Sequence, residues 1–150
     1  MNVKQISIFL ENKPGTLHDI VETLLSNDIH IKSFTAVDLG GITVLRIIVD
    51  NILWTASILK NFGCTASFTE VILINIAGVA GGLTRVLDIL KHNQINIEHV
   101  YPLMGRKSRS INAEEYSLYM IFEVNNVVKA AEVLTQQGIK ITNQEELAAL

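Results

Sequence analysis

The stretch Leu10-Glu11-Asn12-Lys13-Pro14-Gly15-Thr16-Leu17 stands where an alternating apolar run ends and a helical pattern begins. Residues 3–10 predict a strand, because Ile6 and Ile8 alternate with polar neighbours. Pro14 cannot donate to a strand ladder, but it suits the first turn of a helix. A single apolar stripe follows at helical spacing: Leu17, Ile20, Val21, Leu24 and Leu25. The sequence therefore predicts a strand-to-helix turn.

The elements after this helix have equally plain boundaries. Residues 29–38 and 42–49 predict two strands of a hairpin, joined by the tight turn Leu39-Gly40-Gly41. Asn51 can cap a helix over 52–62, and Gly63 is the expected helix stop. Residues 64–76 are strand-like throughout. We interpret them as a fourth strand followed by the first strand of a new unit.

The second half of the chain repeats the first. Residues 6–34 aligned with 72–100 are identical at eight of 29 positions, among them Gly15 with Gly81 and Leu17 with Leu83. Equivalent residues are 66 positions apart in this alignment, whereas the later matches are 75 positions apart. The additional residues fall in the second hairpin, which therefore has a longer, polar connection over residues 104–115. Such a repeat says more about the fold than any single motif does.

Each half reads as strand-helix-strand-strand-helix-strand, the split βαβ pattern of ferredoxin-like folds. The predicted fold class is therefore α+β, with two βαββαβ units over residues 1–70 and 71–150. Each unit has an antiparallel sheet with its helices on one face. Residues 144–150 are expected to add a last helical turn.

Composition narrows the class of protein. Apolar residues make up 49% of the 150, yet no apolar run reaches the ~18–20 residues that span a bilayer. The sequence shows no signal-peptide core, and it has a single cysteine, Cys64, so a cytoplasmic location is expected. The net charge is −3 with scattered charges, which argues against a nucleic-acid partner; the basic group 106–109 is expected at a solvated hairpin tip.

Two predicted strands are apolar on both faces. Residues 42–49 and 71–76 do not alternate as a sheet with one wet face should. The second face is therefore expected to be covered by the sister unit or by another copy of the chain. The simplest such oligomer is a twofold homodimer.

The apolar strand, the turn from Glu11 to Leu17, the amphipathic helix and Ile29-His30-Ile31 together resemble an ACT domain. ACT domains are regulatory modules that bind amino acids or similar metabolites. The match is specific over residues 3–70, and it is weaker over 71–141, where the turn keeps Gly81 and Leu83 but lacks Asn, Lys and Pro. The resemblance implies a non-enzymatic amino-acid sensor made of two ACT units, with no cofactor and no metal.

The resemblance also implies where the ligand lies, namely in the first turn at an interface between two ACT units. Carried over by position, the ligand-binding residues are Asn12, Lys13, Pro14, Gly15, Thr16, Leu17 and His30. His30 departs from the commoner Asn at this position, so the hydrogen bonds to the ligand can differ. A second, weaker site would comprise Ala80, Gly81, Gly82, Leu83 and Asn96.

These residue types suit a free amino acid. The first N–H groups of a helix lack partners and favour a carboxylate. Gly15 permits close approach, and the amide of Asn12 can serve either end of the ligand. Three plainer interpretations stay open: a turn sequence without a ligand, a purely structural His30, and Gly81 and Gly82 that only permit close packing.

Other functions have weaker support. The first half also resembles the ACT half of the acetolactate synthase small subunit, so the alternative is a regulatory subunit of such a biosynthetic enzyme. Against it, the second half looks like another ACT unit. His92 and His99 have no partners at metal-ligand spacing, and no nucleophile or paired carboxylates are placed for catalysis.

Overall fold

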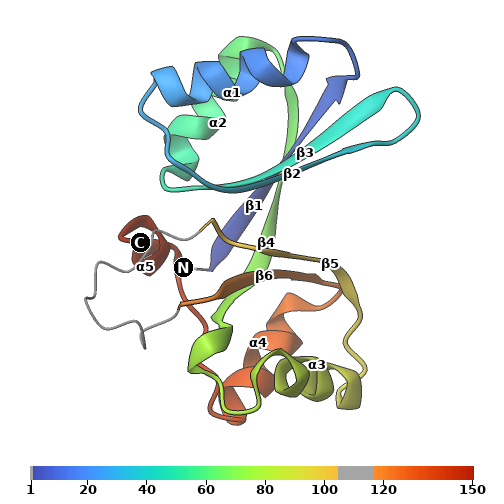
Figure 1. Cartoon of the computed structure of the whole chain (residues 1–150), viewed down its shortest axis with the longest axis vertical. Helices are drawn as coiled ribbons and strands as arrows, with labels where there is room; N and C mark the ends of the chain where they lie inside the picture. Colours follow the sequence, from blue (N-terminus) through green and yellow to red (C-terminus); the bar gives the residue numbers. More distant parts are fainter. Residues whose placement is uncertain (1, 105–116) are drawn as a thin grey trace. The chain divides into compact units, whose positions relative to one another are not determined.

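The computed structural model describes residues 2–104 and 117–150, which group into two compact units. The N-terminal unit comprises Lys4–Thr69, and the C-terminal unit comprises Glu70–Leu150 with Met1–Val3. The elements of the N-terminal unit are β1 (Val3–Glu11), α1 (Thr16–Ser26), β2 (Ile31–Asp38), β3 (Ile42–Val49), α2 (Ile52–Phe62) and the first part of β4 (Thr65–Asn75). This is the predicted βαββαβ order (Figure 1).

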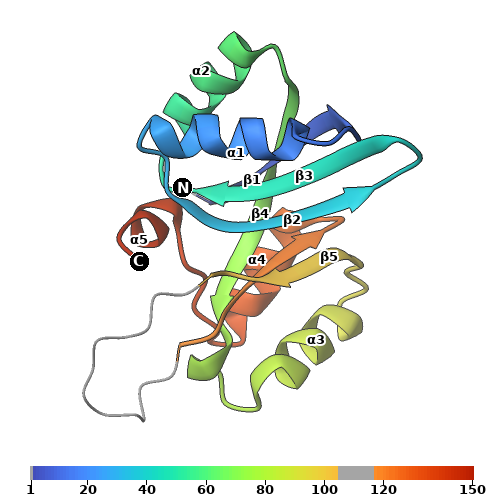
Figure 2. The same ribbon diagram turned by 45° about the horizontal axis from the view of Figure 1, so that its top comes forward.

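The sheet of the N-terminal unit has the strand order β2-β3-β1-β4. β3 pairs antiparallel with both of its neighbours: Ile47 lies opposite Ile6 on β1 and opposite Phe34 on β2. β1 and β2 therefore run parallel to each other, and β2 forms an edge of the sheet. Figure 2 shows α1 lying along the β2–β3 hairpin.

The core of the N-terminal unit lies between this sheet and the helices α1 and α2. Ile20 and Leu24 of α1 are fully buried against Ile6, Ile8 and other core residues. The stripe predicted for this helix is one residue too wide, because Leu25 is 55% exposed. It lies at the border of the stripe, where it lines a groove together with Phe34 of the edge strand β2.

Caps set the helix boundaries as expected. The side chain of Asn51 accepts a hydrogen bond from the backbone N–H of Trp54 at 3.0 Å, and Gly63 ends α2 in the left-handed region. Asn126 forms the same N-cap in the second unit, where its side chain accepts a hydrogen bond from the backbone N–H of Lys129 at 3.1 Å. The repeat is therefore one of local structure as well as of sequence.

The C-terminal unit has the same plan. It contains the second part of β4, the short 3₁₀ turn η1 (Ile76–Gly78), α3 (Gly82–His92), β5 (Ile97–Pro102), β6 (Tyr119–Val124), α4 (Val127–Gln136) and α5 (Gln144–Ala148). Its strands lie in the order β4-β6-β5, all antiparallel to their neighbours. Its core packs α3 and α4 against β4 and β6, with Phe122 and Leu90 buried at the centre. The α+β fold with helices packed on one face is thereby confirmed.

Two details differ from the expected strands. The region expected to form two strands is one unbroken strand, β4, since no Gly or Pro interrupts Thr65–Asn75. The fourth strand of the C-terminal unit is reduced to one bridge, in which the N–H of Thr142 donates to the carbonyl of Leu73 at 2.8 Å. The strand stops there because the next residue, Asn143, caps α5.

The predicted final helical turn is α5. The predicted polar connection and its basic group lie outside the described residues, apart from Met104. None of the helices in the described ranges combines the length and the apolarity needed to cross a membrane.

Candidate ligand-binding site

The first turn joins the end of β1 to the start of α1. The N–H of Asn12 donates to the carbonyl of Gly41 at 2.9 Å, so the turn is fixed to the β2–β3 hairpin. Gly15 has a φ of 89°, a backbone conformation that side chains with a Cβ rarely adopt. The residues from Asn12 to Gly15 are exposed, and Thr16 and Leu17 are half-buried. The predicted stretch therefore forms a surface turn that a ligand can reach.

The backbone of this turn offers hydrogen-bond donors. In the described part of the chain, the N–H groups of Gly15 and Leu17 make no backbone hydrogen bond, whereas the N–H of Thr16 reaches the carbonyl of Lys13 at 3.3 Å. Donors of this kind at a helix start suit a carboxylate. The start of α1 thus presents backbone donors at Gly15 and Leu17.

Lys13 is engaged beside the turn. Its Nζ lies 2.5 Å from a carboxylate oxygen of Glu11, and both side chains are exposed. The hydrogen bond and the charge attraction raise the pKa of Lys13 and lower the pKa of Glu11. Lys13 thus adds little net charge at the turn, and its backbone carbonyl is what holds Thr16 in place.

His30 lies at the opposite end of the sheet from the turn. Because β1 and β2 are parallel, the start of β2 lies level with the start of β1, whereas the turn follows the end of β1. β2 spans roughly 25 Å at about 3.3 Å per residue. The structure does not bring His30 to Asn12 within one unit.

His30 has a local partner instead. Its Nδ1 lies 2.7 Å from one carboxylate oxygen of Asp50, and its backbone N–H donates to the other at 3.0 Å. Burial alone would raise the pKa of Asp50, but hydrogen bonds from His30 and Asn51 outweigh it and lower the pKa. The C-terminal unit repeats the backbone bond, from the N–H of Asn96 to Asn125 at 3.0 Å.

The second turn keeps the shape of the first. Gly81 has a φ of 86°, and α3 begins at Gly82. Leu83 is 36% exposed, and Ala80 is exposed beside it. Asn96 lies at the far end of the sheet, since β4 and β5 are parallel through β6. The structure thus gathers Ala80, Gly81, Gly82 and Leu83 and leaves Asn96 apart.

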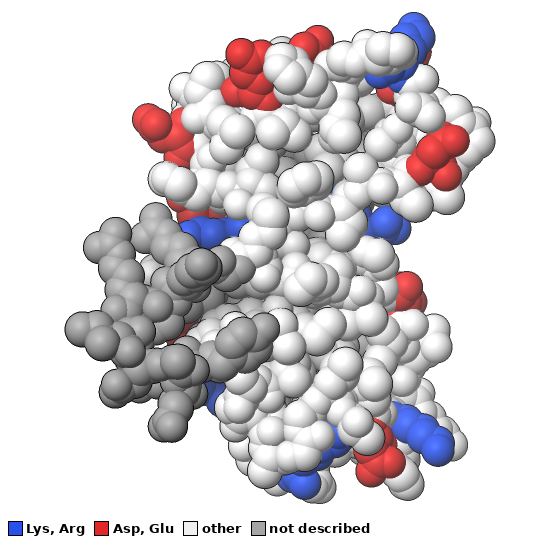
Figure 3. Space-filling view, viewed as in Figure 1, with Lys and Arg blue, Asp and Glu red and all other residues white. Residues whose placement is uncertain are grey.

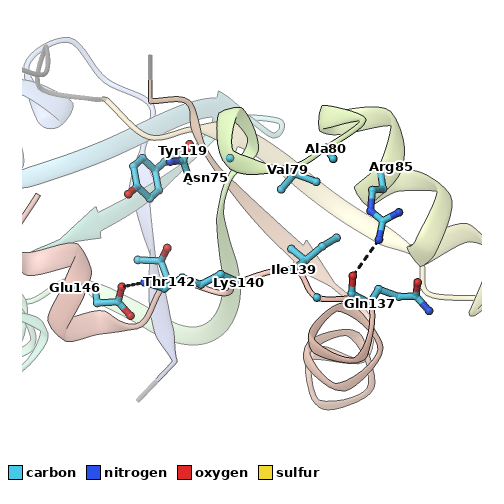
Figure 4. Close-up of a pocket in the computed structure, with 12 residues that line it drawn as sticks. Asn75, Val79, Ala80, Arg85, Tyr119, Gln137, Ile139, Lys140, Thr142 and Glu146 are labelled. Atoms are coloured by element: carbon cyan, nitrogen blue, oxygen red, sulfur yellow. Dashed lines mark hydrogen bonds and ion pairs between the residues drawn. The ribbon is translucent and has the colours of Figure 1, made fainter. Parts of the chain in front are cut away.

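A cavity of about 610 Å³ opens beside this second turn (Figure 4). Its lining comprises Asn75, Gly78, Val79, Ala80, Arg85, Tyr119, Gln137, Gly138, Ile139, Lys140, Thr142 and Glu146. Arg85 Nη2 donates to the carbonyl of Gln137 at 3.0 Å, and Lys140 Nζ lies 2.8 Å from a carboxylate oxygen of Glu146. The hydrogen bond to Glu146 raises the pKa of Lys140, which therefore carries a positive charge near neutral pH.

Sequence reasoning missed these charged residues. Arg85 stands where the repeat has Asp19, so the reversal of charge between the two copies was a usable signal. No sequence pattern connects Arg85 with Lys140, because only the packing of α3 against the end of α4 brings their segments to one cavity.

An apolar groove runs along α1 beside the edge strand β2. It has a volume of about 730 Å³ and is lined by the apolar residues Leu17, Val21 and Leu25 of α1 and Phe34 of β2 and by the polar residues His18, Glu22 and Ser26 of α1. Leu25 and Phe34 are 55% and 49% exposed. The groove begins at the first turn, through Leu17, and reaches the edge strand β2.

His18, Asp19 and Glu22 form a cluster on the exposed side of α1. Their ligand atoms lie within 4.8 Å of one another. Asp19 and Glu22 raise the pKa of His18, chiefly through the hydrogen bond to Asp19. Exposed groups of this kind are common without a metal ion, and the cluster carries no metal assignment.

On the face shown in Figure 3, acidic and basic side chains are dispersed among uncharged ones.

Comparison with known proteins agrees with this fold. The crystal structure of protein BT0572 from Bacteroides thetaiotaomicron is 27% identical, has a TM-score of 0.84 and covers 100% of this chain and 98% of that one. The regulatory subunit of aspartate kinase from Thermus thermophilus is 13% identical, with a TM-score of 0.58 and coverage of 91% and 93%. Aspartate kinase from Clostridium acetobutylicum is 14% identical, with a TM-score of 0.51 and coverage of 90% and 32%. The last two likenesses concern the fold alone.

No curated protein matches the sequence significantly. A family model described as the ACT domain pair matches residues 1–150. The match spans both units and agrees with the repeated βαββαβ order of the structure. The chain therefore belongs to the ACT domain pair family.

Proposed function

We propose that this chain is a small-molecule sensor that binds a free amino acid in the first turn, at an interface between two copies of the chain. The observation that carries the proposal is the exposed turn with unpaired donors at Gly15 and Leu17, continuous with an apolar groove. The donors suit the ligand carboxylate, and the groove suits an apolar neighbour. The role is regulatory and not catalytic.

The second copy supplies what one unit lacks. Two β2 edges that meet across a twofold axis run antiparallel. The start of β2 in one copy then lies beside the end of β2 in the other, which is the end of the sheet that carries the turn. His30 of the second copy would thereby approach Asn12 of the first. Binding at such an interface would favour one arrangement of the copies over another.

Calorimetry of the full chain against the twenty amino acids tests the proposal. At least one should bind with a Kd below about 1 mM. Asn12→Ala should weaken binding of that amino acid, whereas the control Asn61→Ala, an exposed position on α2, should not. If none of the twenty binds in this range, the sensor proposal fails.

A mixing experiment tests the shared site. Asn12→Ala and His30→Ala homodimers should each have lost tight binding. In mixed dimers one site receives both substitutions and the other receives none, so equimolar mixing should restore about a quarter of the wild-type binding capacity. A site formed within one copy would regain nothing on mixing.

A partner enzyme is compatible with the same site. The aspartate kinase regulatory subunit shares the fold, and the first half resembles the acetolactate synthase small subunit. Co-purification of a large biosynthetic subunit with the tagged chain would assign it this role. A homo-oligomer without such a partner would favour the independent sensor.

A further inference from the structure

The cavity in the C-terminal unit needs no second copy of the chain. All of its lining residues lie in Glu70–Leu150. Its volume of about 610 Å³ is in the range of small-ligand pockets. It lies where the C-terminal unit has only the single bridge at Thr142 in place of a full fourth strand.

The charges of the cavity are asymmetric. Arg85 and Lys140 are cationic and Glu146 is anionic, so the lining carries one net positive charge. Figure 4 shows Arg85 and Gln137 on one side, and Lys140 with Glu146 on the other. Since Glu146 balances Lys140 in their ion pair, the excess charge lies at Arg85.

Arg85 lies beside Gly81 of the turn, and a hydrogen bond to Gln137 holds its guanidinium. A Cβ on Gly81 would lie 3.1 Å from the Cβ of Arg85 and 3.6 Å from its Cδ, so the glycine leaves room for the arginine to lie across the turn. One terminal nitrogen bonds to the carbonyl of Gln137. The planar guanidinium has five donors, enough to bind a carboxylate in addition.

The rest of the lining suits a short apolar group. Val79, Ala80 and Ile139 are apolar, and Tyr119 and Asn75 place polar side chains across the cavity from Arg85. The N-terminal unit has Asp19 at the position equivalent to Arg85, so it does not repeat this chemistry. We propose that the cavity is a separate binding site for a small organic monocarboxylate, with Arg85 as its main anion-binding group.

Titration of the ¹⁵N-labelled full chain, followed by NMR, tests this site. The probes are pyruvate, L-alanine and L-valine, with inorganic phosphate as the competing anion. At least one carboxylate should cause saturable shifts at the amides of Gly78, Ala80 and Gly138 below about 10 mM. No saturation with any carboxylate, or saturation with phosphate alone, would overturn the proposal.

Variants identify the anion-binding group. Arg85→Gln should raise the Kd at least about tenfold, since a charge-assisted hydrogen bond is lost. Lys140→Gln, at an exposed side chain, provides a second variant that preserves the fold and should raise the Kd less. The matched control Lys91→Gln on α3 should leave the Kd unchanged. An unchanged Kd in Arg85→Gln, or a Kd that Lys140→Gln raises as much as Arg85→Gln does, would overturn the assignment. The amides whose shifts are measured all belong to the C-terminal unit. The result for this cavity therefore does not depend on whether the first turn binds an amino acid.

Discussion

His30 Nδ1 lies 2.7 Å from a carboxylate oxygen of Asp50, and this pair joins the start of β2 to the end of β3. The equivalent pair in the C-terminal unit, Asn96 and Asn125, keeps the backbone hydrogen bond without any charge. The comparison separates two roles of Asp50: accepting the backbone N–H, which an amide oxygen also does, and carrying a charge beside the imidazole.

Asp50→Asn tests the charge alone. The folded-state pKa of Asp50 lies below its ordinary value of 3.8, so its ionised form stabilises the fold above that pH. This contribution is lost as the pH falls through the lowered pKa. The variant should therefore be less stable than wild type at pH 6, and the difference should vanish in strong acid. Urea unfolding followed by circular dichroism at both pH values measures it. Asp28→Asn, at an exposed residue, is the control and is measured at the same two pH values.

Gly15→Ala and Gly81→Ala form a matched pair at the two turns. Both glycines have φ near 90°, so each substitution should cost about 1–2 kcal/mol of unfolding free energy. Gly81→Ala should cost more, because its Cβ would lie 3.1 Å from Arg85, whereas nothing lies within 4 Å of the Cβ built on Gly15. Equal costs in urea unfolding would show that Arg85 moves aside freely.

Leu25→Glu should prevent the proposed dimer. The side chain is 55% exposed in the apolar groove of α1, so a carboxylate there would be harmless in a monomer and costly in an apolar interface. Size-exclusion chromatography with light scattering should give a lower mass for this variant than for wild type. Leu53→Glu, on α2 and 85% exposed outside the groove, is the control. An unchanged mass for Leu25→Glu would place the interface elsewhere.

Trp54→Phe removes a link between the two helices of the N-terminal unit. The indole Nε1 donates to the carbonyl of Asn27 at 3.0 Å, just after the end of α1. Because the indole is 46% exposed and water can replace the bond, the loss should be about 1 kcal/mol or less. Thermal unfolding followed by circular dichroism measures it. A loss of several kcal/mol would mean that Trp54 stabilises the unit by packing.

The sequence predicted the secondary structure well where local signals are strong. Asn51 and Gly63 mark the ends of α2, and the helical stripe of α1 buries Ile20 and Leu24. The prediction of strand boundaries failed where no residue marks a boundary, and where an adjacent residue starts another element. No residue type separates the two predicted strands in β4, and Asn143 shortens the last strand by starting a helix.

By itself, the sequence determined the repeated fold and the turn that begins at Asn12, because periodicity, glycine positions and caps act over a few residues. Tertiary structure decided which side chains meet. The parallel course of β1 and β2 places His30 far from the turn, so the proposed ligand would contact both only between two copies of the chain. The packing of α3 and α4 brings Arg85 to the carbonyl of Gln137, 52 positions along the chain, a distance that no local pattern spans.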